Sequence, residues 1–148
     1  MPDEVGGNAG PRTEMIAISE LYPGEYSLSE KTLAKHRASL QRHEAFLPIN
    51  VLRLDDRLIV RDGNNRVRVW IEFHQNQDQE VPSIECVISA PTLREMPRSF
   101  RRTWERIADY FGNGLGAFLR MRVSDDSTGN SFDKVRAEER RKIENHFK

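Results

Sequence analysis

The stretch from Ile59 to Arg66 limits the possible folds more than any other segment. A short apolar run ends in Asp62-Gly63, and a segment with helical character begins at once. Gly63 can adopt backbone angles that other residues avoid. A helix that begins there points free backbone N–H groups at whatever precedes it, which suits a phosphate, and Arg66 could add a guanidinium one turn later. The stretch therefore predicts an anion-binding junction or, more simply, a tight turn between strand and helix.

Charge and composition limit the classes of partner. The chain has 148 residues, which fits one domain; 37% are hydrophobic and 31% charged, so a core can form with much charged surface left over. Lys+Arg and Asp+Glu are both 23, which gives a formal net charge of zero. General attraction to nucleic acid or to an anionic membrane is therefore not expected, although a local basic patch could still provide it.

Three further features bear on where the protein is found. No run of about 18 apolar residues occurs, so we expect no transmembrane helix and no membrane partner. Residues 1–13 are polar and rich in Gly and Pro, which predicts a flexible tail rather than a signal peptide. The single cysteine, Cys86, cannot form an internal disulfide and is expected to be a small core residue. A cytoplasmic location is the resulting expectation.

Residues 14–90 alternate short apolar runs with helical patterns and form the expected domain. We predict strands at residues 15–18, 49–52, 58–60 and 84–88. A capping box, Ser27-x-x-Glu30, opens a helix that ends near His43, and a second helix runs from Asn64 to about Phe73. The inward-facing positions of these helices are Leu33, Ala34, Leu40, Val67, Trp70 and Ile71. Strands mixed with helices in this way indicate an α+β or α/β fold.

Residues 91–148 are expected to form a helical C-terminal extension. Thr92-x-x-Glu95 resembles another capping box, and a helical stripe follows from Arg98 onward. The apolar positions of that stripe are Phe100, Trp104, Ile107, Ala108 and Phe111. Residues 112–114 break the helix, and residues 115–123 are a second apolar segment that we predict as helix or strand. After a polar loop at 124–130, a last helix begins at Ser131 and ends near Phe147.

The order of these segments resembles a known superfamily. Within residues 38–51, a Ser-aliphatic pair on a helix is followed by a turn and then by Pro48-Ile49-x-Val51, which resembles the helix–loop–strand of the ParB/sulfiredoxin superfamily. The resemblance continues through residues 59–69 and covers roughly residues 15–90. It implies an α+β fold with a small mixed sheet, flanking helices and a nucleotide site, and it leaves the C-terminal third unexplained.

Two branches of this superfamily fit the sequence poorly. Sulfiredoxins have a catalytic Cys where this chain has Asn64, and their covalent chemistry requires a thiolate, so that activity is not expected. ParB partition proteins hold the triphosphate of CTP with a Gly-Glu-Arg-Arg motif, of which only Gly63 and Arg66 are present. Residues 22–26 replace their upstream arginine motif, and zero net charge argues against a strong binder of the phosphate backbone. A role in chromosome partition is therefore not expected.

The chain looks most similar to the archaeal free-serine kinases and their relatives. They have an Asp-Gly-His-His-Arg motif or a close variant, and a glutamate soon after the first strand. This chain has the run Asp62-Gly63-Asn64-Asn65-Arg66 and the run Leu21-Tyr22-Pro23-Gly24-Glu25. The resemblance implies a nucleotide-binding protein that uses ATP, ADP or CTP with Mg, and a phosphotransferase acting on a small hydroxylated substrate.

The same resemblance implies a role for each motif residue. Glu25 would be the general base, and Asp62 would hold Mg or orient the phosphate. Gly63 and Asn64 would offer backbone N–H groups, Asn65 its side-chain amide, and Arg66 a charge that neutralises the transferring group. Phosphoryl transfer needs positioning and charge stabilisation more than covalent chemistry, so this set could suffice. Asparagine in place of the two histidines removes any role that requires an ionisable imidazole.

A second class of function also remains open, namely a non-catalytic, nucleic-acid-associated or regulatory binding module of the ParB-like class. Five arginines gather around one expected helix: Arg94, Arg98, Arg101, Arg102 and Arg106. They could lie along nucleic acid. We favour instead a solvated face on which they pair with Glu95, Glu105 and Asp109. Self-association through the last helix is a further possibility.

Overall fold

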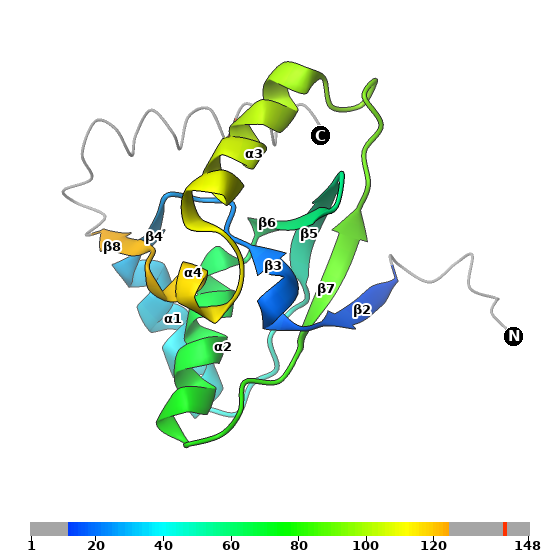
Figure 1. The fold of residues 1–148 in the computed structure, drawn as a ribbon. Helices are drawn as coiled ribbons and strands as arrows, with labels where there is room; N and C mark the ends of the chain where they lie inside the picture. Colours follow the sequence, from blue (N-terminus) through cyan, green and yellow to red (C-terminus); the bar gives the residue numbers. More distant parts are fainter. Residues whose placement is uncertain (1–11, 125–140, 142–148) are drawn as a thin grey trace, which may run out of the picture.

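The computed structural model describes residues 12–124 and residue 141, and its centre is a five-stranded sheet (Figure 1). In spatial order the strands are β2 (Thr13–Ile16), β7 (Ile84–Ser89), β5 (Ile49–Leu54), β6 (Arg57–Asp62) and β3 (Leu21–Tyr22). The pairs β2–β7 and β5–β6 are antiparallel, whereas β5–β7 and β3–β6 are parallel. This mixed sheet with helices confirms the α+β class; the ParB/sulfiredoxin-like arrangement stays a prediction.

Alternation along β6 divides the core between the two faces of the sheet. Leu58 and Val60 pack in a large cluster with side chains of α1 (Glu30–Gln41) and α2 (Asn64–Asn76). Ile59, between them, packs instead with Trp104 of α3 (Arg98–Phe111). Because successive side chains of a strand point to opposite faces, α1 and α2 cover one face and α3 reaches the other. The stripe predicted for α3 is confirmed: Trp104, Ile107, Ala108 and Phe111 are buried, and Phe100 is half-buried.

The segment after residue 111 returns to the core. Gly112 and Gly114, both with positive φ, end α3, and then come α4 (Leu115–Leu119) and β8 (Arg122–Ser124). Residues 115–123 thus contain both the helix and the strand that the sequence left as alternatives. Strand β8 pairs in parallel with β4 (Ser27–Ser29) to form a small second sheet. Ala117, Phe118 and Met121 belong to the same cluster as the residues of α1 and α2.

Several local predictions were wrong at the ends of elements. Ser27 does not cap α1, because it lies in β4; the cap is Ser29, whose Oγ accepts a hydrogen bond from the Thr32 N–H at 3.2 Å. The first strand ends at Ile16, and Ile18 begins a 3-10 helix, η1 (Ile18–Glu20). Ala34, which was expected to face inward, is exposed.

Other local predictions were confirmed. Thr92 and Glu95 form both bonds of a capping box: the Thr92 N–H donates to Glu95 Oε1 at 2.9 Å and the Glu95 N–H to Thr92 Oγ1 at 3.2 Å. Helix α3 begins only after Pro97, so this box closes a separate turn. Cys86 is a fully buried core residue, and burial raises the pKa of its thiol to about 12.

The remaining predictions concern the ends of the chain and the membrane. No helix of the described part is long and apolar enough to span a bilayer. The flexible tail predicted up to residue 13 falls almost wholly outside the described residues, as do most of the loop at 124–130 and, apart from Arg141, the helix from Ser131.

Candidate functional site

The junction between β6 and α2 is built around Gly63. Its φ of 119° lies in the region that glycine tolerates best, and α2 begins at the next residue, as the sequence predicted. A Cβ at this position would lie 2.5 Å from Cγ2 of Ile49 and 2.7 Å from its Cβ. Both the backbone angle and the neighbouring strand therefore require glycine here. The first turn of α2 faces the end of β6, with N–H groups that have no acceptor within the helix.

Asn64 joins two distant segments through its side chain, which is fully buried. Its Nδ2 donates to the Val60 carbonyl at 3.1 Å, and its Oδ1 accepts the Gly24 N–H at 3.0 Å. Asn65 acts similarly, since its Oδ1 accepts the Ser29 N–H at 3.1 Å. Asn64 and Asn65 thus hold the segment from Gly24 to Ser29 against α2.

Arg66 points into the protein, and only 12% of its side chain is exposed. Its Nη1 donates to the carbonyls of Leu47 and Pro48, at 2.7 and 3.1 Å, and its Nη2 lies 3.5 Å from Asp62 Oδ2. The guanidinium therefore fixes the loop that leads into β5. Any contact between Arg66 and an anion would have to share or displace these bonds.

Asp62 ends β6 with 60% of its side chain exposed. Besides Arg66, its Oδ2 accepts a hydrogen bond from Asn50 Nδ2 at 3.3 Å. Asn50 was not identified from the sequence. The regular register of the β5–β6 hairpin would place Asn50 opposite Arg61, but an irregularity between Asn50 and Val51 shifts the pairing by one residue and places Asn50 opposite Asp62.

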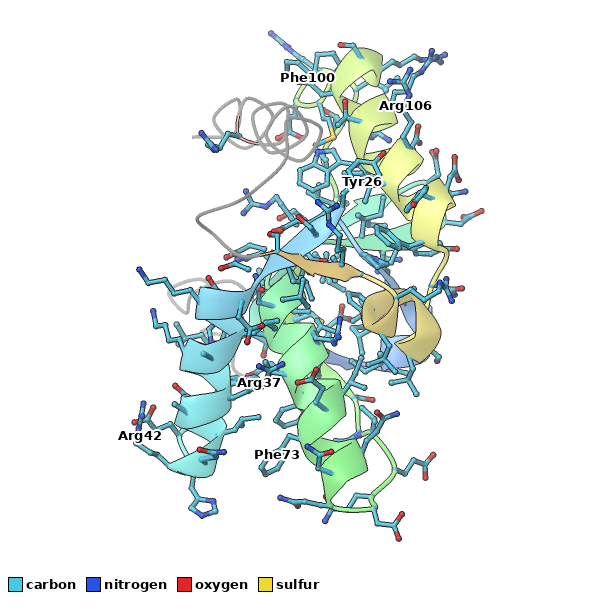
Figure 2. The ribbon with its side chains drawn as sticks, turned by 90° about the vertical axis from the view of Figure 1, so that its left-hand side faces the viewer. Tyr26, Arg37, Arg42, Phe73, Phe100 and Arg106 are labelled. Atoms are coloured by element: carbon cyan, nitrogen blue, oxygen red, sulfur yellow. The ribbon has the colours of Figure 1, made fainter. Side chains whose placement is uncertain are left out.

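Glu25, half-buried, lies in a loop that is held on both sides. Before it, Gly24 is bonded to Asn64 and packs so closely on β6 that a Cβ there would lie 2.0 Å from the Val60 oxygen. After it, the ring of Tyr26, which is labelled in Figure 2, packs with its centroid 5.5 Å from that of Tyr110 and 6.2 Å from that of Phe111. The structure thus brings the loop that carries Glu25 next to the junction that carries Asp62, Gly63 and Asn64.

His36 of α1 is a titratable neighbour of the junction that the sequence did not single out for this role. Its ring packs edge-on against Phe46, with 5.7 Å between centroids. Burial lowers the pKa of His36, and the positive charges of Arg66 and Lys35 lower it further, while Asp62 acts in the opposite direction. His36 therefore responds to the same two charges that line the end of β6.

The arginines around α3 are not paired as we expected. Glu95 is bonded to Thr92, and Asp109 forms an ion pair with Arg57 of β6 at 2.5 Å. Within the described residues, none of the five arginines forms an ion pair with a carboxylate. The expected pairing fails because Asp109 faces the β5–β6 hairpin and Glu95 closes its own turn.

Three cavities are lined by described residues. One of about 410 Å³ borders the N-terminal half of α3, one of about 110 Å³ lies between α1 and α2, and one of about 430 Å³ is lined by apolar side chains near Trp70 and Phe73. None of these three is lined by residues 62–66. Among residues 12–124 and 141, no three His, Cys, Asp or Glu side chains are grouped to hold a metal ion.

Comparison with known proteins adds little. No protein-family model matches the chain, and no curated protein matches it. Among solved structures it is similar to the crystal structure of protein Atu1540 from Agrobacterium tumefaciens, with 17% sequence identity and a TM-score of 0.42. The match covers 88% of this chain and 91% of that chain. At this level of similarity no functional argument can be drawn from it.

Proposed function

We propose that the chain is a nucleotide-binding protein of the ParB/sulfiredoxin-like class, with the phosphate end of the nucleotide bound at the first turn of α2. One observation carries this proposal: Asn64 bonds to Gly24, so the Glu25 loop lies beside the Asp62-Gly63 junction. A backbone turn with free N–H groups, a carboxylate exposed at its edge and a second carboxylate on a fixed loop are together suited to a phosphate and a metal ion.

The residues of the motif then divide into two groups. Main-chain N–H groups of Asn65 and Arg66 would contact the phosphate, because Asn64 is fully buried. Asp62 would contact Mg, which commonly binds one or two protein carboxylates together with phosphate oxygens. Asn64, Asn65 and Arg66 would act through position, because their side chains already bond to Gly24, Ser29 and the Leu47-Pro48 segment. ATP, ADP and CTP are the candidate nucleotides.

The catalytic form of the proposal is phosphoryl transfer to a small hydroxylated substrate. The substrate oxygen would attack the terminal phosphorus while the bond from that phosphorus to the bridging oxygen breaks. Glu25 would accept the hydroxyl proton, and the shortened nucleotide would leave with its Mg. Such a reaction depends mainly on alignment and charge stabilisation.

Thermal unfolding with ATP, ADP, CTP and GTP, with and without Mg, tests binding. A nucleotide at about 100 times its Kd should stabilise the fold by about 2.7 kcal/mol. Asp62→Asn should remove the Mg-dependent part of the shift, whereas Asp56→Asn, on the exposed hairpin turn, should leave it unchanged. If none of the four nucleotides raises Tm at millimolar concentration, the binding proposal fails.

Catalysis is tested separately from binding. Turnover of the bound nucleotide in the presence of small hydroxylated acceptors should fall by about 10²-fold or more in Glu25→Gln, while nucleotide affinity is retained. Binding without turnover for any acceptor would favour the non-catalytic module. Turnover that persists in Glu25→Gln would exclude Glu25 as the base.

A further inference from the structure

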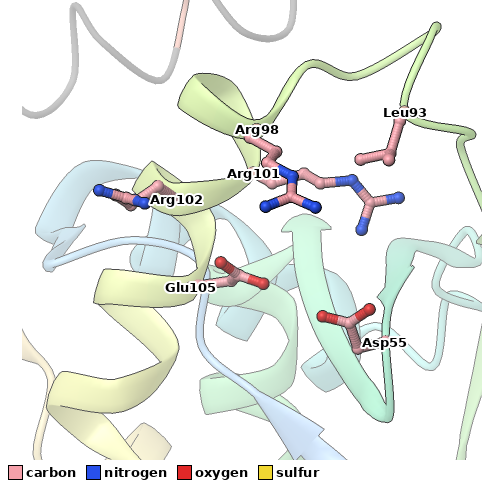
Figure 3. A pocket seen from close by; sticks show the side chains of 6 residues that line it. All are labelled: Asp55, Leu93, Arg98, Arg101, Arg102 and Glu105. Carbon is pink, nitrogen blue, oxygen red and sulfur yellow. The ribbon is translucent and has the colours of Figure 1, made fainter.

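A cationic cavity lies at the opposite side of the sheet from α1 and α2. Arg98, Arg101 and Arg102 of α3 line it, together with Leu93, Glu105 and Asp55 of the β5–β6 turn, and its volume is about 410 Å³ (Figure 3). Figure 3 shows the guanidiniums of Arg98 and Arg101 between α3 and the hairpin that carries Asp55. We call Arg98, Arg101 and Arg102 the arginine face.

The arginine face differs from the other arginines around the core. Arg37, Arg57, Arg66 and Arg68 each form an ion pair with a carboxylate. Within the described residues, no such pair involves an arginine of the face, even though Asp55 and Glu105 line the same cavity. Unpaired guanidiniums gathered in one place produce a local positive potential on a chain whose formal net charge is zero.

The helix that carries the arginine face is anchored in the core. Trp104, Ile107 and Ala108 bury the opposite side of α3 in the core. Arg101 Nη2 donates to the Pro91 carbonyl at 2.7 Å, which fixes that side chain, and its buried Nε has no hydrogen-bond partner among the described residues. Arg98 and Arg102 are exposed. The guanidiniums are therefore carried on a fixed helix rather than on a loop, and that of Arg101 is held by a hydrogen bond.

The spacing of the arginines along α3 favours a polymer over a single small anion. Arg98 and Arg102 of the arginine face, and Arg106 beyond it, recur every four residues and together extend about 12 Å along α3. Guanidiniums bind phosphate oxygens in a forked geometry, and nucleic acid presents phosphates at regular short intervals. We propose that the arginine face binds the phosphate backbone of nucleic acid.

Salt dependence of binding tests this proposal. Fluorescence anisotropy with a short labelled DNA duplex, and with a single-stranded RNA of the same length, gives the affinity between about 50 and 200 mM NaCl. For the duplex, three phosphate contacts predict a log–log slope of about −2.7 and therefore a loss of about 40-fold over this range. For the single strand they predict a slope of about −2.1 and a loss of about 18-fold. The two probes show which kind of strand the face prefers.

Four variants separate the arginine face from general charge. Arg98→Ala/Arg102→Ala should reduce the slope by about two and weaken binding at low salt. Lys35→Ala/Arg42→Ala, which removes one charge from α1 and one from its C-cap, should change neither. Arg98→Lys/Arg102→Lys should keep most of the slope, because it keeps the charges. Asp55→Asn should tighten binding, since it removes a repulsive carboxylate from the cavity at a turn position, φ 54°, that asparagine tolerates.

Several results would overturn the proposal. The first is that neither probe binds at about 50 mM NaCl. The second is that Lys35→Ala/Arg42→Ala loses as much affinity as Arg98→Ala/Arg102→Ala, and the third is that binding does not weaken with salt. A poly-glutamate peptide that competes as well as the nucleic acid at equal charge would assign the face to an acidic protein instead. Thermal unfolding of each variant establishes that a loss of binding is not a loss of fold.

Discussion

Asn64 decides the local structure of the candidate site through a single carboxamide. It satisfies the Val60 carbonyl and the Gly24 N–H, two main-chain groups from segments far apart in the sequence. A buried main-chain group that loses its partner costs about 1–3 kcal/mol. The side chain therefore contributes to stability and to site geometry at the same time.

Asn64→Leu should lower the free energy of unfolding by about 2–5 kcal/mol, because it leaves both of these groups without a partner. Urea unfolding followed by circular dichroism measures the change. Asn113→Ala is the matched control: its Nδ2 donates to the Ser19 carbonyl at 3.0 Å on the surface, and we expect a loss of less than about 1 kcal/mol. Equal losses for the two variants would contradict the role that we assign to Asn64.

The titration of His36, beside the junction, should make the free energy of unfolding depend on pH. Burial and the charges of Arg66 and Lys35 lower the pKa of its imidazole in the folded state, so the unfolded chain binds the proton more readily. The stability that the neutral imidazole of His36 contributes is fully present above its ordinary pKa of 6.5, and it is lost as pH falls through the lowered pKa of the folded state. Urea unfolding between pH 8 and 5 should show a shallower decline in His36→Gln than in the wild type; identical profiles would exclude His36.

At the scale of elements, α1, α2 and α4 are linked through one carboxylate. Glu72 of α2 accepts hydrogen bonds from Arg37 of α1, at 3.1 and 3.4 Å, and from Arg68 of its own helix at 3.0 Å. Arg68 Nη1 also donates to the carbonyls of Phe118 and Met121, at 3.1 and 3.2 Å. Arg68 therefore connects α2 to the end of α4.

Arg68→Met should loosen α4 and β8 selectively. Hydrogen exchange of their amides should become at least about tenfold faster, because hydrogen bonds to a charged group contribute about 1.5–3 kcal/mol. Arg37→Met removes the other partner of Glu72 without touching α4, so exchange in α4 should stay at the wild-type rate. Acceleration of α4 in both variants would show that the link is not specific to Arg68.

For the whole molecule, the sheet needs elements from both halves of the chain. Leu52, Leu54 and Ile59 are covered by Trp104 and Ala108 of α3, and Met96 completes that cluster. Complete burial of a large apolar side chain contributes about 1.5–3 kcal/mol relative to exposure. A chain without α3 would expose one face of its central strands.

A fragment of residues 1–90 should therefore show no cooperative unfolding transition, whereas a fragment of residues 1–124 should unfold cooperatively. Circular dichroism during urea titration, with two-dimensional NMR of each fragment, distinguishes these outcomes. A well-dispersed spectrum for residues 1–90 would instead support an independent domain followed by a separate extension.

The sequence predicted those elements whose signals are local. The spacing of Trp104, Ile107 and Phe111 was sufficient for α3, and Asp62-Gly63 marked the start of α2 correctly. Prediction from the sequence failed where a contact with a distant segment determines the local structure. Ser27 has the spacing of a capping residue, but its pairing with Arg122 places it in a strand. The side chains of Asn64 and Arg66 bond to main-chain groups 40 and 19 residues away, which no local spacing reveals.

The pairing of β4 with β8 constrains the order in which the protein can fold during its synthesis. Ser124 Oγ donates to the Leu28 carbonyl across 96 residues of chain, and the β4–β8 pairing spans a similar distance. During synthesis on the ribosome, β4 cannot pair with β8 until nearly all of the described chain has emerged. Because β4 leads directly into α1, the entry to that helix is completed only after the residues of β8 have been synthesised.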